Sequence, residues 1–152
     1  MKLAEALIKR SDLKNKAEEI KKRLSQNIKV QEGEEPIEEA KTLFYQYNTL
    51  MDELETIAQR INKTNALTKF EDITIIDAIT KRDCFKVKIA TYRDMIEKAS
   101  KLRDSSFGRE EATKYVRCVD INELQKQTDD MSRQFRQLDT KIQGLNWMTD
   151  LL

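Results

Sequence analysis

Apolar residues recur along most of the chain in alternating steps of three and four residues, a spacing that places them on one face of an α-helix. One such stripe consists of Leu3, Ala6, Arg10, Leu13, Ala17, Ile20 and Leu24, and a second of Ala40, Leu43, Tyr47, Leu50, Leu54, Ile57 and Ile61. Long helices with stripes of this period pack side by side at shallow angles. The sequence therefore predicts an all-α protein.

Breaks in the pattern predict four helices, at about 2–27, 36–65, 74–103 and from about 120 onward. Gly33 and Pro36 end the first stripe, and the segments TIID (74–77) and DINE (120–123) resemble capping boxes. The content of 36% charged residues, three Gly and one Pro is typical of long helices. The alternation of Ile28 and Val30 leaves one alternative open, a minor β-ribbon between linker segments 28–30 and 115–119.

Two phrases of the first half return in the second half in the same order. EALIKRSDLKNKA (5–17) aligns with DAITKRDCFKVKI (77–89), and RINKTNALT (60–68) aligns with KIQGLNWMT (141–149). We interpret this as a tandem-duplicated helical hairpin, with repeats at about 1–68 and 73–152. The two hairpins are expected to form one domain over 1–152, an antiparallel four-helix bundle or coiled-coil array.

The charge balance limits the classes of partner. The 28 Lys and Arg residues nearly cancel the 27 Asp and Glu residues, whereas a nucleic-acid surface needs a net basic stripe. The N-terminus carries no signal-peptide pattern, and uncharged stretches such as 142–149 are far shorter than the roughly 20 apolar residues of a membrane span. On these grounds we expect a soluble, cytoplasmic protein. We expect neither a nucleic-acid partner nor a role at a membrane.

The residues needed for common catalysis are scarce. The chain has no His, and Cys84 and Cys118 stand in no nucleophile or metal motif. The acidic run at 32–39 lacks the spaced oxygen ligands of a calcium loop. We therefore expect no enzyme activity, no cofactor and no metal site.

Arg10 and Arg82 occupy matching places within apolar stripes, where a charge is costly unless it is paired. Glu55 and Asp139 are candidate partners at similar height. In a four-helix bundle, these arginines would share one pole with Asn65, Asn146 and Trp147. One interpretation is a pocket that binds a small anionic ligand. The other is that the arginines fix helix register while the two asparagines cap helix C-termini in the left-handed conformation.

The second helix carries an additional heptad stripe, formed by Ile37, Phe44, Met51 and Ala58. The equivalent positions of the last helix hold Cys118, Gln125, Ser132 and Asp139. An apolar face present in only one repeat must be covered, either by other helices of the chain or by a partner subunit. We predict a homo-oligomer with this stripe at its interface.

The phrases MKLAEALIKRSDL (1–13), KVQEGEEP (29–36), RINKTNALT (60–68), KYVRCVD (114–120) and LNWMTDL (145–151) give the chain a resemblance to the septicolysin-like family of small bacterial proteins. That resemblance implies a helical protein of unknown function, and the family name implies a haemolysin. The residues themselves favour a structural or interaction protein. A haemolysin-like membrane-active protein and a bundle that binds a small anion are the alternative functions.

Overall fold

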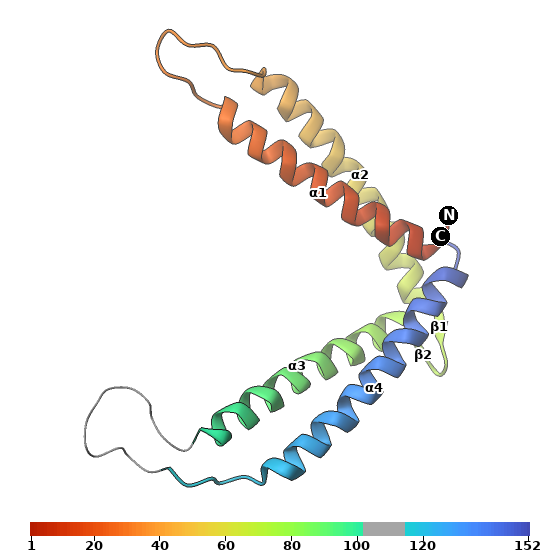
Figure 1. Cartoon of the computed structure of the whole chain (residues 1–152). Helices are drawn as coiled ribbons and strands as arrows, with labels where there is room; N and C mark the ends of the chain where they lie inside the picture. Colours follow the sequence, from red (N-terminus) through yellow and green to blue (C-terminus); the bar gives the residue numbers. More distant parts are fainter. Residues whose placement is uncertain (102–114) are drawn as a thin grey trace, which may run out of the picture. The chain divides into compact units, whose positions relative to one another are not determined.

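The computed structural model describes residues 1–101 and 115–152 and contains four long helices and one small β-hairpin (Figure 1). The helices are α1 (Leu3–Asn27), α2 (Ala40–Leu67), α3 (Ile75–Ser100) and α4 (Ile121–Met148), and the strands are β1 (Lys69–Phe70) and β2 (Ile73–Thr74). The predicted fold class, an all-α helical bundle fold built from helical hairpins, is confirmed.

The chain forms two compact units. The first consists of Met1–Ile75 together with Gln143–Leu152, and the second of Ile76–Ile142. Each unit contains an antiparallel helical hairpin, α1 with α2 in the first and α3 with the larger part of α4 in the second. The interpretation of the chain as one domain made of two duplicated repeats stays a prediction.

The predicted stripes form the core of the first unit. Leu43 of α2 is almost completely buried and packs with Ile20 and Leu24 of α1, and Tyr47 and Leu50 cover this cluster. Each large aliphatic side chain buried in this way stabilises the fold by about 1.5–3 kcal/mol. The three-and-four spacing of the sequence therefore translates directly into the contact between the two helices.

Polar contacts close the connection between α1 and α2. Asn27 is buried; its amide donates to the carbonyl of Arg23 (2.9 Å), and its Oδ1 accepts from the backbone N–H of Glu38 (2.9 Å). The Arg23 guanidinium binds both carboxylate oxygens of Glu38, with Nε–Oε2 at 2.8 Å. This hydrogen bond lowers the pKa of Glu38 below its usual range. Gly33 takes a φ of 89° in the turn that Glu34 N closes on Gln31 O (3.0 Å), a conformation that favours glycine.

The alternative of a β-ribbon between 28–30 and 115–119 is wrong, because neither segment forms a strand. Each linker is held by its own hairpin instead. The first is closed by the Asn27 contacts, and in the second the Arg117 guanidinium donates to the carbonyl of Ala99 at the end of α3 (3.0 Å). The β-hairpin lies at 69–74, where Lys69 pairs with Thr74 and Phe70 with Ile73.

The predicted start of the second helix shifts, whereas that of the fourth does not. Helix α2 begins at Ala40 rather than near Pro36, because Glu38 is engaged by Arg23 and Asn27 before the helix starts. Helix α4 begins where predicted: Oδ1 of Asp120 accepts from the N–H groups of Asn122 (2.9 Å) and Glu123 (3.2 Å). The predicted extension of the third helix to about residue 103 lies partly outside the described residues.

The two chain ends meet within the first unit. Leu3 N donates to Thr149 O (2.9 Å), Leu151 N donates to Met1 O (3.0 Å), and Lys2 Nζ lies 2.9 Å from the carboxylate of Asp150. The C-terminal residue is fixed to α2, since Leu152 N donates to Oγ1 of Thr64 (3.0 Å) and Arg60 Nε donates to Leu152 O (2.8 Å). The end of the chain is thus an integral part of this unit.

Candidate functional site

Arg82 forms ion pairs with two carboxylates, as expected for a charged residue within an apolar stripe. Its guanidinium lies 3.3 Å from Asp139 of α4, the partner predicted from the sequence, and 2.8 Å from Asp83. Arg10 is half-buried in the first unit and makes no ion pair with the described residues, and its predicted partner Glu55 accepts a hydrogen bond from Gln59 instead (2.9 Å). Because two carboxylates already neutralise Arg82, this arginine is a poor candidate for binding a free anion.

Asn65, Asn146 and Trp147 belong to the first unit, as Arg10 does, whereas Arg82 belongs to the second. The predicted left-handed caps at the two asparagines are wrong. Helices α2 and α4 continue to Leu67 and Met148, and backbone bonds such as Thr68 N to Thr64 O (2.9 Å) complete their last turns. Asn146 is buried and, among the described residues, its Oδ1 has no hydrogen-bond partner, while the indole of Trp147 is exposed. The predicted ligand site at these residues stays a prediction.

The predicted additional stripe, which we call the α2 stripe (Ile37, Phe44, Met51 and Ala58), faces solvent. Its placement within one helix is wrong for Ile37, because α2 begins at Ala40 and Ile37 lies in the bend before it. Ile37 is 95% exposed, Phe44 46% and Met51 38%, and Ala58 is half-buried. The stripe lies roughly a quarter turn around α2 from the face that packs against α1. Within the part of the chain that the structure describes, no helix covers it.

Three polar residues lie beside the α2 stripe on the same face of the helix. Lys41, Asn48 and Glu55 each follow a stripe residue by four positions, and all three are exposed. Lys41 makes no ion pair with any described residue. This face of α2 therefore carries a row of apolar side chains beside a polar row, in which Lys41 is positive, Asn48 is neutral and Glu55 is negative.

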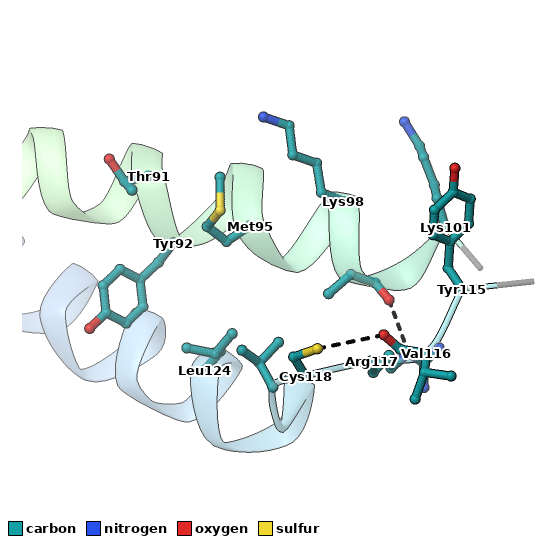
Figure 2. Close-up of a pocket in the computed structure, with 12 residues that line it drawn as sticks. Thr91, Tyr92, Met95, Lys98, Lys101, Tyr115, Val116, Arg117, Cys118 and Leu124 are labelled. Carbon is teal, nitrogen blue, oxygen red and sulfur yellow. Dashed lines mark hydrogen bonds between the residues drawn. The ribbon is translucent and has the colours of Figure 1, made fainter. Parts of the chain in front are cut away.

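A pocket of about 590 Å³ lies between the end of α3 and the segment that leads into α4 (Figure 2). Its apolar walls come from Tyr92 and Met95 of α3, Val119 of the linker and Leu124 of α4. Sequence reasoning missed this pocket because it treated 115–119 as a possible strand.

The cations at the rim of this pocket are already engaged. Lys98 pairs with Asp94 (2.8 Å) and Lys101 with Glu97 (2.6 Å), which raises the pKa of Lys101. In Figure 2 both lysine side chains point away from Leu124 and Cys118. The thiol of Cys118 lies 3.8 Å from the carbonyl of Val116. The third cation of the lining, Arg117, donates to the carbonyl of Ala99 (3.0 Å). The pocket is thus an apolar hollow whose cationic side chains all have partners.

Comparison with known proteins places the chain in a family. The model of a family of unknown function (DUF6847) matches residues 10–151, and the chain belongs to this family. A crystal structure of a functionally unknown conserved protein from Corynebacterium diphtheriae superimposes with a TM-score of 0.90 and 34% sequence identity, over 100% of this chain and 99% of that chain. The search of curated proteins gives no match.

The resemblance to the septicolysin-like family is therefore wrong, and with it the basis for a haemolysin-like function. Among residues 1–101 and 115–152, no helix is long and apolar enough to cross a bilayer.

Proposed function

We propose that this member of the DUF6847 family is a structural or interaction protein without catalytic activity, and that it works as a homodimer joined through the α2 stripe. The observation that carries the proposal is the solvent exposure of Phe44 and Met51 on one face of α2, together with that of Ile37 just before the helix begins. Burying a Phe and a Met side chain is worth about 1.5–3 kcal/mol each, and a symmetric interface buries each of them twice.

The polar row beside the stripe favours a second copy of the same chain as the occupant. In a two-fold interface, a residue i that contacts j is matched by j contacting i. If two α2 helices cross in antiparallel orientation with the dyad near Asn48, Phe44 of each copy lies close to Met51 of the other. Lys41 and Glu55 then stand roughly 10 Å to either side of the dyad and face each other across the interface.

The two kinds of contact have different roles in this dimer. Exposed ion pairs such as Lys41 with Glu55 contribute at most about 1 kcal/mol each, so they set the orientation rather than the affinity. The affinity comes from the burial of Phe44 and Met51. A parallel pair of α2 helices would place Lys41 beside Lys41 and Glu55 beside Glu55, which disfavours it.

The compartment that we propose is the cytoplasm. Cys84 and Cys118 are both exposed and unpaired, and the exposure of Cys84 agrees with its place on the polar face of the first repeat's pattern. A reducing compartment maintains exposed thiols in this state.

The dimer is tested by size-exclusion chromatography with light scattering of the wild-type chain, Phe44→Asp and Thr49→Asp. Thr49 is exposed on the side of α2 away from the stripe and donates to the carbonyl of Tyr45 (3.0 Å), so its variant controls for a new charge in the same helix. We expect two chains per particle for wild type and Thr49→Asp, and one chain for Phe44→Asp with unchanged helical circular dichroism. A single chain per particle for the wild type at about 100 µM, or an unchanged mass for Phe44→Asp, contradicts the proposal.

A charge exchange tests the antiparallel orientation. Lys41→Glu places like charges opposite each other and weakens the dimer, and the double variant Lys41→Glu/Glu55→Lys restores the original affinity. If the double variant dimerises no better than Lys41→Glu alone, the two side chains do not face each other.

A further inference from the structure

The second unit contains a groove between α3 and α4 that the sequence did not indicate. Its volume is about 420 Å³, within the range of small-molecule sites. We call it the α3–α4 groove and define it by its lining residues: Lys86, Ile89, Ala90 and Arg93 of α3, and Ser132, Phe135 and Arg136 of α4.

The charged side chains that line this groove are all positive. Lys86, Arg93 and Arg136 make no ion pair with any residue of 1–101 or 115–152, and no lining residue is acidic. The neighbouring arginines behave differently, since Arg82 binds Asp139 and Asp83, and Arg133 pairs with Asp130. Three cations that converge on one concave surface create a positive potential that attracts an anion.

Ser132 supplies a second, independent indication of a ligand. Its side chain is only 8% exposed, it lines the groove, and its Oγ has no hydrogen-bond partner among the described residues. One turn earlier, Thr128 donates to its own helix at Leu124 O (2.7 Å), so the unpaired state of Ser132 is not a general property of this face. A buried hydroxyl without a partner is unfavourable, and a ligand oxygen in the groove would satisfy it.

The remaining lining is apolar. Ile89 is buried at 7% exposure, and Phe135 is half-buried beside it. Arginine side chains offer planar forks of donors that match the oxygens of a phosphate, and three positive charges exceed what a single carboxylate needs. A ligand that contacts both the cationic and the apolar part of the groove therefore has a dianionic group joined to an apolar group.

We propose that the α3–α4 groove binds a small organic phosphate. Arg93, Arg136 and Lys86 surround the phosphate oxygens, Ser132 Oγ–H donates to one of them, and the apolar group of the ligand lies against Ile89 and Phe135. This site is independent of the α2 stripe, which lies in the first unit.

The proposal is tested by isothermal titration calorimetry of the full chain with phenyl phosphate, inorganic phosphate and the uncharged benzyl alcohol. We expect phenyl phosphate to bind most tightly, inorganic phosphate more weakly and benzyl alcohol not at all. Arg136→Gln weakens phenyl phosphate binding at least tenfold, since a charge-assisted hydrogen bond is lost. Arg133→Gln is the matched control: it removes the same charge three residues earlier in α4, outside the groove, and leaves the affinity within twofold.

Ser132→Ala separates a ligand-binding role from a structural one. Removing an unpaired buried hydroxyl raises the melting temperature of the ligand-free protein, and the increase exceeds that of Ser25→Ala, an exposed helical serine with the same gain in helix propensity. The same substitution weakens phenyl phosphate binding severalfold. Absence of phenyl phosphate binding, equal binding by Arg136→Gln and Arg133→Gln, or unweakened binding by Ser132→Ala overturns the proposal.

Discussion

Two hydrogen bonds attach the C-terminal residue to α2, one from Arg60 and one to the hydroxyl group of Thr64, and the second can be removed with little change in side-chain shape. Thr64 is fully buried, and its Oγ1 donates to the carbonyl of Arg60 (2.9 Å) and accepts from the N–H of Leu152 (3.0 Å). Thr64→Val keeps a β-branched side chain of nearly the same shape but cannot accept a hydrogen bond. The N–H of Leu152 then loses its acceptor in a partly buried place.

The expected loss follows from these contacts. One hydrogen bond contributes about 1 kcal/mol net to the free energy of unfolding. Because the substitution also leaves a donor without an acceptor, we expect the free energy of unfolding to fall by about 1–2 kcal/mol in all. For a chain of this size, that corresponds to a decrease in melting temperature of about 2 to 8 °C. Urea unfolding followed by circular dichroism measures the free energy directly.

Thr56→Val is the control for this prediction. Thr56 lies in the same helix and donates to the carbonyl of Asp52 (2.9 Å), but it is exposed and accepts no hydrogen bond from a distant segment. We expect its free energy of unfolding to change by no more than about 0.5 kcal/mol. If Thr64→Val is no more destabilising than Thr56→Val, the hydrogen bond between Thr64 and Leu152 contributes nothing to stability and the reasoning is refuted.

Two further predictions concern the α1–α2 connection and the dimer. Arg23 holds the pKa of Glu38 below its usual value of 4.5, so the ionised carboxylate stabilises the fold above that value and the contribution is lost as pH falls through the lowered pKa. The difference in melting temperature between wild type and Glu38→Gln should therefore be larger at pH 7 than at pH 2, and a difference independent of pH contradicts this. For the dimer, Asn48→Cys in a Cys84→Ser/Cys118→Ser background should form an interchain disulfide on mild oxidation, because the dyad brings the two copies of residue 48 together. Thr56→Cys in the same background should remain monomeric on denaturing gels, and equal cross-linking of both variants argues against the antiparallel register.

The core of the first unit could be predicted from the sequence because its information is local. Leu13, Leu24, Leu43 and Ile61 fall on three-and-four stripes, and any pair of helices with such stripes buries them against each other. The β-hairpin was missed because each strand has only two residues, too few for a period-two pattern. The meeting of the chain ends was missed for a different reason, since a backbone hydrogen bond such as that from Leu3 N to Thr149 O leaves no trace in side-chain spacing.

Among the candidate sites, too, those that depend on local sequence pattern could be predicted and those that depend on tertiary contacts could not. The Arg82–Asp139 pair was predictable because a charge inside an apolar stripe requires a partner. The α3–α4 groove was not, because Lys86, Arg93 and Arg136 look like ordinary surface charges in a sequence whose charges balance overall. That these three cations have no ion-pair partner depends on the tertiary structure and cannot be seen in the sequence. The one sequence signal was Ser132, a polar residue at the place where the other repeat has Met51.

Sedimentation equilibrium of the unmodified chain over a range of concentrations tests the central claim most directly. Self-association through the α2 stripe predicts a mass that rises to twice the 17.9 kDa of one chain and a return to the single-chain mass for Phe44→Asp. A mass of 17.9 kDa at every concentration would show that the stripe does not join two copies of this protein.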